Sequence, residues 1–338
     1  EKIWYPKHLS LEQCSSEITA RYKARLLQGD SLTDLTGGFG IDCSFLATGF
    51  KSATYVERQE ELCEIAAHNF PVLNLNHINI KNEDGVTYLQ VMSPVDCLFL
   101  DPARRNEHGG KTVAISDCEP NVAELEELLL QKANRVMIKL SPMLDLSLAL
   151  KELKQTQEVH ILSVNNECKE LLILLGQTSP AEISIHCVNL FTKGTQKEQH
   201  FVFTREQEQC SECTYTDSLE TYLYEPNASL LKAGAFRSIA AAYPVRKLHP
   251  NSHLYTSDTF IENFPGRIFR IVNQCSFNKK EVKENLADLK KANVTVRNFP
   301  ATVAELRKRI HLAEGGDTYL FASTLNNGQK VLIRCEKV

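Results

Sequence analysis

Apolar residues in the first two thirds of the chain follow two different spacings. Short runs at residues 95–100 and 159–164 are rich in Leu, Val, Ile and Phe and predict buried strands, and a shorter apolar run with Leu32 and Leu35 predicts another. Residues 60–69 and 121–132 instead place apolar side chains three and four positions apart, which predicts helices. Strands that alternate with helices indicate a parallel sheet covered on both faces. We therefore predict a doubly wound α/β domain.

The same criteria assign the other elements of this part. A helix is predicted at residues 10–28, where Ser10 and Gln13 have the spacing of a capping box. Residues 182–191 and 199–204 alternate between apolar and polar positions and predict an antiparallel hairpin at the edge of the sheet. The remaining predictions are helices at 41–49, 144–153 and 169–175, a short helix before the strand at 95–100, and strands at 53–56, 78–80 and 135–140.

The pattern changes beyond residue 205. Residues 205–217 are polar and acidic, which indicates a linker. We then predict a helix at 227–242, a strand at 266–272, helices at 279–291 and 302–310, a strand at 294–299, and a hairpin of 318–324 and 330–335 that turns at Asn327-Gly328. This tail is typical of a small α+β region. The expected organisation is a helical lead-in at 1–30, the α/β domain at 31–207, and further regions at 215–265 and 266–338.

Charge is distributed unevenly along the chain. The net charge is −4, yet residues 1–213 carry 20 Lys and Arg against 30 Asp and Glu, whereas residues 214–338 carry 18 against 12. A basic C-terminal part can meet phosphates. The candidates are Arg237, Arg246, Lys247, Arg267, Arg270, Arg297, Arg307, Lys308 and Arg309. Solvated helix faces are the alternative, which we favour for Lys279, Lys280 and Lys283.

Composition indicates a cytoplasmic protein. No apolar run approaches the roughly 20 residues that span a bilayer, and we expect no signal peptide. The first residue is Glu1, so we expect an N-terminal segment to be missing. Eleven scattered cysteines resemble small buried hydrophobes in a reducing compartment. Cys210 and Cys213 form the one C-x-x-C, but no second pair follows and only His186 and His200 are near, so we expect no metal.

A glycine cluster follows the first predicted strand. Residues 34–42 read DLTGGFGID, and a second strand ends at Glu57. Glycines let a ligand approach the backbone closely, and a carboxylate at the next strand end can accept both ribose hydroxyls. A dinucleotide site favours G-x-G-x-x-G without a carboxylate beside the diphosphate, whereas Asp34 here suits a cationic amino-acid moiety. A plain strand-to-helix turn with Asp34 as a helix cap is the alternative.

Four acidic residues end successive predicted strands, at Asp34, Glu57, Asp84 and Asp101. Ligands of open α/β sheets bind outside these strand ends, near the point where the strand order reverses. We expect Asp34 to face an ammonium group and Glu57 a ribose. Asp84 is expected to face an adenine amino group, and Asp101 the reacting centre.

These motifs resemble the class I S-adenosylmethionine-dependent methyltransferases. DLTGGFGID is similar to their first motif, YVERQEELCEIAAHN to the ribose-binding segment, NEDG to the adenine loop, and LFLDPARR to the strand end beside the target atom. The resemblance implies a seven-stranded sheet and S-adenosyl-L-methionine as cofactor. The implied cofactor-binding residues are Asp34, Thr36, Gly37, Gly38, Gly40, Glu57, Arg58, Asp84, Gly85 and Asp101.

The chain is also similar to a bacterial methyltransferase family in three features: the lead-in HLSLEQCSSEITARYKA, the DPARR motif and the basic tail. The C-terminal part of that family is described as ferredoxin-like, which would correspond to residues 215–265, and THUMP-like, which would correspond to 266–338. THUMP domains bind RNA, so the resemblance implies an RNA substrate.

The acceptor side is expected to involve Asp101, Pro102 and Arg104. Proline fixes the turn so that its carbonyls face a substrate amino group. Enzymes that methylate exocyclic amines usually carry an aromatic residue at the position of Arg104, and an arginine plane can also stack on a base or bind a phosphate. D-P-x-R endings resemble enzymes that methylate carbon 5 of uridine through a cysteine, but no cysteine stands at the next strand end, at residues 139–142.

The loop that follows is polar and long enough to cover a substrate. Arg105 and Lys111 are, with Arg104, the candidates for substrate contact. His108 can serve as a general base, although a solvated loop histidine is the favoured interpretation.

The sequence therefore predicts a methyltransferase that acts on a tRNA or rRNA base by direct transfer. The alternatives are methylation of a small molecule or protein, a non-catalytic RNA-binding protein with a nucleoside-binding fold, and a dinucleotide-dependent oxidoreductase.

Overall fold

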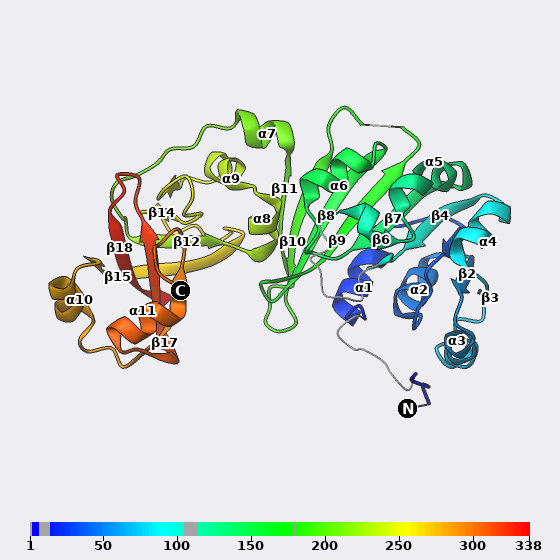
Figure 1. Cartoon of the computed structure of the whole chain (residues 1–338), viewed down its shortest axis with the longest axis horizontal. Coiled ribbons are helices and arrows are strands. Elements are labelled where there is room, and N and C mark those ends of the chain that lie inside the picture. Colours follow the sequence, from blue (N-terminus) through cyan, green and yellow to red (C-terminus); the bar gives the residue numbers. More distant parts are fainter. Residues whose placement is uncertain (1, 7–13, 105–113, 179) are drawn as a thin grey trace. The chain divides into compact units, whose positions relative to one another are not determined.

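The computed structural model describes residues 2–6, 14–104, 114–178 and 180–338. The chain forms two compact units, residues 1–198 and 199–338 (Figure 1). The first unit is an α/β structure, in agreement with the predicted fold class, and the second contains a separate sheet.

Alternating elements build the first unit. Its helices are α1 (Glu17–Ala24), α2 (Ile41–Leu46), the 3₁₀ helices η2 (Ala47–Gly49) and η3 (Ile115–Asp117), α3 (Glu60–Val72), α4 (Gly85–Val91), α5 (Val122–Lys132) and α6 (Leu146–Glu152). Its strands are β1 (Ser31–Asp34), β2 (Ser52–Glu57), β3 (Ile78–Asn82), β4 (Val95–Leu100), β5 (Ala103–Arg104), β6 (Cys118–Glu119), β7 (Ala133–Leu140), β8 (Thr156–Val164), β9 (Glu167–Gly176) and β10 (Ser184–Leu190); β11 (Glu198–Thr204) begins at the boundary between the units.

The large sheet has the order β11-β10-β8-β9-β7-β4-β1-β2-β3. Strands β3, β2, β1, β4 and β7 pair in parallel, and β8 pairs in parallel with β10. From β1 the chain first adds β2 and β3 on one side of the sheet, and it then returns to the other side of β1 to add β4. The order therefore reverses at β1, where a ligand site is expected. Figure 1 shows helices on both sides of this sheet.

Strand β9 corrects the sequence prediction, which made residues 169–175 a helix in a sheet of seven strands. The sheet has nine strands, and β9 pairs antiparallel with both β7 and β8. Asn165 and Asn166 have φ of 49° and 69°, which is the backbone of a tight hairpin turn. The five residues from Leu171 to Leu175 are fully buried, and an apolar run this short does not distinguish a central strand from a buried helix.

Helix α1 is shorter than the predicted helix at 10–28. It begins after Ser16 and ends at Ala24, and the next residues form a turn. Ser10 and Gln13, the predicted capping box, lie outside the described residues. The shorter helix still buries Tyr22 and Lys23.

The second unit is built around a seven-stranded sheet of order β13-β14-β12-β15-β18-β17-β16. Its strands are β12 (Tyr222–Pro226), β13 (Arg246–Lys247), β14 (Tyr255–Ser257), β15 (Gly266–Ser276), β16 (Lys291–Val296), β17 (Ala313–Thr324) and β18 (Lys330–Lys337). Its helices are α7 (Arg205–Cys210), α8 (Ala228–Ala233), α9 (Phe236–Ala242), α10 (Lys279–Leu286) and α11 (Val303–Ile310). The final hairpin turns at Gly328, whose φ is 85°.

Three sequence predictions for this unit were inaccurate. The predicted linker contains helix α7, because Thr204 and Gln207 form a capping box. The predicted helix at 227–242 is two helices, since Gly234 adopts a φ of 76° and ends α8. The predicted helix at 279–291 ends five residues early, because Lys291 already belongs to β16.

We expect Ile173→Ala to lower the free energy of unfolding by about 2–5 kcal/mol, because it opens a cavity in a fully buried strand. Thermal or urea unfolding followed by circular dichroism measures the change. Glu167→Ala, at the exposed start of the same strand, is the control and should change it by less than about 0.5 kcal/mol. Equal effects of the two substitutions would contradict the buried position of β9.

Candidate functional site

A cleft of about 1620 Å³ lies in the first unit at the carboxyl ends of β1, β2, β4 and β7. All the predicted site residues whose side chains are described line it: Asp34, Thr36, Gly37, Gly38, Gly40, Glu57, Arg58, Asp84, Gly85, Asp101 and Pro102. The four strand-end carboxylates thus share one cleft, as the parallel order of the strands requires.

The glycine turn forms the floor of this cleft. Gly38 and Gly40 have φ of 55° and 82°, which side chains disfavour. At Gly37 a Cβ would lie 2.2 Å from the ring of Tyr55, so only glycine fits. The Gly37 N–H donates to the carbonyl of Val56. The turn is therefore closely packed against β2.

Asp34 is a buried carboxylate with one unpaired oxygen. Its side chain accepts a 3.0 Å hydrogen bond at Oδ1 from the Thr36 N–H, and Oδ2 has no hydrogen-bond partner within the described part of the chain. The residue is 1% exposed, and burial raises the pKa of its carboxyl to about 8. It caps no helix, because Gly40 is the N-cap of α2. A cation in the cleft would neutralise this carboxylate.

Glu57 connects β2 to the glycine turn. Its carboxylate accepts 2.9 Å hydrogen bonds from the N–H groups of Gly38 and Gln59. Both oxygens are thus fixed by the backbone, and each keeps a second acceptor position. A carboxylate held in this way is suited to accept from a ligand hydroxyl pair.

Asp84 and Gly85 form the third strand end. Asp84 Oδ1 accepts from the N–H groups of Val86 and Thr87, so it is the N-cap of α4. A Cβ on Gly85 would lie 2.1 Å from the carbonyl oxygen of Leu35. This glycine therefore allows α4 to pack against the chain just after β1.

Asp101 belongs to a buried network of charges that the sequence did not reveal. Lys139, at the end of β7, lies 2.6 Å from Asp101 Oδ2 and 3.0 Å from Asp42 Oδ2. Lys23 of α1 lies 2.8 Å from Asp42 Oδ1 and 2.7 Å from Glu170 Oε2. The only sequence signal was the position of Lys139 at the tip of an apolar strand.

The network controls the ionisation of its members. Burial alone would raise the pKa of Asp42, but Lys23 and Lys139 lower it to about 2. Burial would lower the pKa of Lys139, but Asp101 and Asp42 raise it above its usual value. Asp42 and Lys139 are therefore charged at neutral pH. The Asp101 N–H also donates a 2.6 Å hydrogen bond to Thr36 Oγ1, which joins the end of β4 to the glycine turn.

The chain after Asp101 is described only in part. Residues 103–104 form β5, which pairs antiparallel with β6. Nothing is described of the Arg104 side chain, and Arg105, His108 and Lys111 lie outside the described residues. The exposed side chains of Arg58 and Glu119 form an ion pair, with 3.3 Å between Nη1 and Oε1.

Two cysteines line the cleft, Cys14 and Cys118. Burial raises the pKa of Cys14, which leaves it as a thiol rather than a reactive thiolate. Cys97 lies inside β4, where burial raises its pKa to about 11. Neither Cys14 nor Cys97 therefore has the lowered pKa of a nucleophilic cysteine.

The N-terminal residues 2–6 lie against α3 and the glycine turn. The Trp4 ring stacks on His68 with centroids 3.9 Å apart, and the backbone of Trp4 exchanges two hydrogen bonds with the Asn69 side chain. The Tyr5 ring lies 5.5 Å from that of Phe39, and Pro6 lines the cleft. Sequence reasoning did not identify this contribution to the cleft.

Many of the predicted phosphate contacts of the second unit are already paired. Glu225, which is 1% exposed, binds both Arg267 and Arg297. Other ion pairs join Arg246 to Glu220, Arg270 to Glu336 and Arg307 to Glu314. Lys247 is buried, and burial lowers its pKa to about 8.

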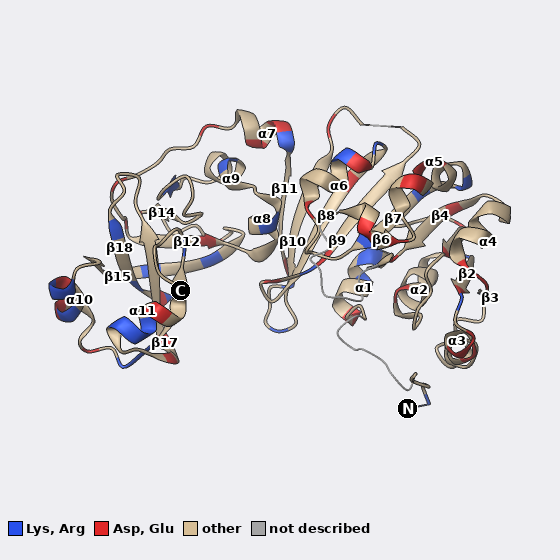
Figure 2. Ribbon diagram, viewed as in Figure 1, with Lys and Arg blue, Asp and Glu red and all other residues tan. Residues whose placement is uncertain are grey.

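Within the described ranges, Arg237, Lys308 and Arg309 form no ion pair. Figure 2 shows Lys and Arg gathered on α11, which carries Arg307, Lys308 and Arg309 in its last turn. Among the described helices, none is long and apolar enough to cross a membrane.

The chain resembles a solved structure over almost its whole length. The crystal structure of a "putative methyltransferase" from Porphyromonas gingivalis W83 is 37% identical, with a TM-score of 0.91 over 99% of this chain and 84% of that chain. An rRNA methylase from Streptococcus thermophilus has 15% identity and a TM-score of 0.34 over 47% of this chain and 93% of that one. An O-methyltransferase from Bacillus cereus in complex with SAH has 12% identity and a TM-score of 0.38 over 49% and 70%.

Family models match the second unit. Residues 222–265 match a ferredoxin-like domain, and residues 266–337 match a THUMP-like domain. Among curated proteins there is no significant match. From its identity with the Porphyromonas protein over nearly its full length, the chain belongs to the same methyltransferase family, and its C-terminal region is ferredoxin-like and THUMP-like.

Proposed function

We propose that the chain uses S-adenosyl-L-methionine to methylate a base of tRNA or rRNA. The observation that carries the cofactor assignment is the buried, unpaired Oδ2 of Asp34 in the cleft. Burying a carboxylate without a partner is costly unless a cation or a proton neutralises it. S-adenosylmethionine would bring such a cation, its ammonium group, together with an electrophilic methyl group on its sulfonium.

The other strand ends complement the remainder of this cofactor. Glu57 can accept from the ribose hydroxyls, since each carboxylate oxygen keeps an acceptor position. Asp84 and Gly85 are assigned to the adenine side, and Thr36, Gly37, Gly38, Gly40 and Arg58 to the surrounding wall.

Asp101, Pro102 and Arg104 are assigned to the acceptor. Lys139 holds the Asp101 carboxylate in place, so that it can accept a hydrogen bond from an acceptor N–H. Alignment of the two reactants would supply most of the acceleration of a direct methyl transfer. We assign Arg104, Arg105 and Lys111 to substrate contact.

The RNA assignment rests on the THUMP-like match at residues 266–337 and on the basic C-terminal part. Lys308 and Arg309 on α11 are the favoured phosphate contacts, because neither is paired with a carboxylate in the described part of the chain.

Asp34→Asn is expected to weaken binding of S-adenosylhomocysteine at least tenfold, because the amide lacks the charge that pairs with the ammonium group. Isothermal calorimetry measures the dissociation constant. Asp30→Asn, which removes an exposed ion pair with Lys51 just before the other end of β1, is the matched control and should bind as the wild type does. Equal affinity of the Asp34 variant would contradict the assignment.

The same variant should have the opposite effect on the stability of the ligand-free protein. The pKa of Asp34 is about 8 when folded and about 4 when unfolded, so rising pH between these values favours unfolding. Asp34→Asn removes this penalty and should raise the melting temperature at pH 8 relative to the wild type.

In the wild type, affinity for S-adenosylhomocysteine should increase from pH 6 to 7.5 as Asp34 ionises, and this pH dependence should be absent from the variant.

Transfer of labelled methyl groups to RNA tests the activity. The wild type should label total RNA from cells that lack the gene, and digestion of the product identifies the base. Asp101→Asn should reduce incorporation by about 10²–10⁴ without changing cofactor affinity more than threefold. Labelling of protein or small molecules alone, or of nothing, would contradict the RNA assignment.

Replacing Lys308 and Arg309 together by alanine should weaken binding to unmodified tRNA and reduce the slope of log affinity against log salt by about 1–2. Fluorescence anisotropy over a range of salt concentrations measures both. Arg270→Ala, which removes an exposed residue paired with Glu336, is the control and should leave the slope nearly unchanged. An unchanged slope in the double variant would exclude α11 from the RNA contact.

A further inference from the structure

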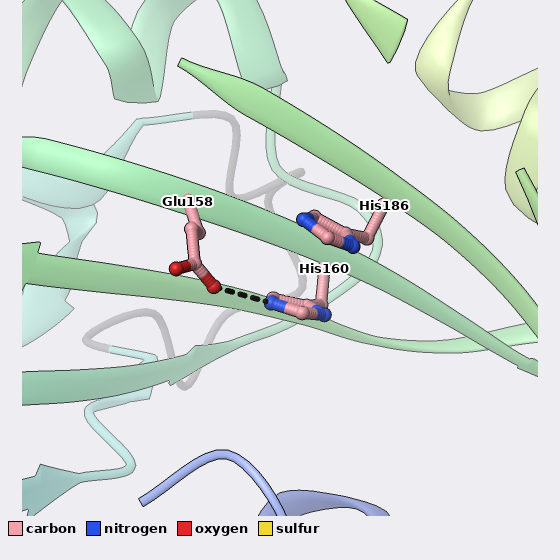
Figure 3. A group of neighbouring side chains, drawn as sticks. All are labelled: Glu158, His160 and His186. Carbon is pink, nitrogen blue, oxygen red and sulfur yellow. Dashed lines mark hydrogen bonds and ion pairs between the residues drawn. The ribbon is translucent and has the colours of Figure 1, made fainter. Parts of the chain in front are cut away.

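A second cluster of chemistry-bearing side chains lies in the first unit, outside the set of residues that line the cleft. Glu158 and His160 are two positions apart on β8, and His186 of β10 is the register partner of His160. Alternate residues of a strand share a face, as do register partners on neighbouring strands, so the three side chains project together. Figure 3 shows them as one group, and their ligand atoms all lie within 4.8 Å of one another.

We propose that Glu158, His160 and His186 bind a divalent transition-metal ion of the zinc type. Imidazole nitrogens and carboxylate oxygens bind Zn²⁺ at about 2.0–2.2 Å, which places neighbouring ligands of a tetrahedral site about 3.3 Å apart. His160 Nε2 and Glu158 Oε2 are separated by 3.2 Å. This pair already has the spacing that one shared ion requires, and three protein ligands would leave a fourth position for water.

The groups around the cluster orient its ligands. The Tyr22 hydroxyl lies 2.8 Å from His160 Nδ1, so the other ring nitrogen of the proposed ligand is held, as is usual for histidines bound to metals. Arg135 lies 3.1 Å from Glu158 Oε1 and leaves Oε2 directed at His160.

The carboxylate is available as an anionic ligand. Its Oε1 pairs with Arg135, and its Oε2 accepts a hydrogen bond from His160. On metal binding, the proton on His160 Nε2 would move to Nδ1, and the Tyr22 hydroxyl would change from donor to acceptor. The step conserves protons, because the imidazole changes tautomer without changing charge.

His186 has to rotate for the ion to enter. Its ring stacks on that of His160 with centroids 4.3 Å apart and an interplanar angle of 15°, so the nitrogens of the two rings lie in nearly parallel planes. An ion lies close to the plane of each imidazole that binds it, which parallel rings do not allow. His186 is partly buried and its Nε2 is 3.2 Å from Ser184 Oγ, so this hydrogen bond and the stack are among the contacts that the rotation has to break.

The test is metal binding by the full chain, stripped with a chelator and carrying Cys210→Ser and Cys213→Ser to remove the C-x-x-C thiols. Competition with a chromophoric chelator should give one equivalent of Zn²⁺ with a dissociation constant in the micromolar range or below. His186→Ala should weaken that equivalent at least 100-fold, and Tyr22→Phe about tenfold. His77→Ala, at a histidine bound to the carbonyl of Ala47, is the control and should bind as its parent does.

Co²⁺ in place of Zn²⁺ identifies the ligands. The proposal predicts visible absorption of a four-coordinate site without a thiolate charge-transfer band. Glu158→Gln is less decisive, because it also removes the ion pair with Arg135, whereas His186→Ala leaves that pair in place. Absence of the equivalent, its retention in His186→Ala, or a thiolate band would overturn the proposal.

Discussion

The buried ion pairs centred on Asp42 connect the elements that form the cleft. Asp42 of α2 contacts Lys23 of α1 and Lys139 of β7, and these lysines reach Glu170 of β9 and Asp101 after β4. Removing one partner of such a network typically costs about 3–5 kcal/mol, although the intact network adds little net stability. Its main effect is on geometry, because the four ion pairs fix the positions of α1, α2, β7 and β9 and of the end of β4 relative to one another.

Asp34 is a buried acidic residue of the cleft that the lysines of this network do not pair with. Lys23 and Lys139 both form ion pairs with other carboxylates. The negative charges of Asp42 and Asp101 act in the same direction as burial and raise the pKa of Asp34 further. The ligand-free protein therefore bears an energetic cost at this position. A site prepared in this way binds a cation without first having to displace a protein partner, which is the general advantage of preorganisation.

The sequence predicts the site best at positions where the structure accepts only one type of residue. Gly37 and Gly85 have no room for a side chain, and the parallel order of strands brings their terminal carboxylates to one edge. The errors have equally specific causes. Residues 171–175 are too short a run to show a period, and the signal of a hairpin at Asn165 was overlooked. Two ion pairs of the lysine network, Lys139 with Asp42 and Lys23 with Glu170, join residues 97 and 147 positions apart, which no local pattern reports.

The N-terminal segment at Trp4 has an experimental consequence. Trp4 is the only tryptophan of the chain, and its neighbour Tyr5 lies against Phe39 of the glycine turn. Intrinsic indole fluorescence therefore arises from a single position beside the cleft, and its stacking on His68 makes it sensitive to the charge of that imidazole. The protein thus contains its own optical reporter, which can follow events at the glycine turn in solution without a label.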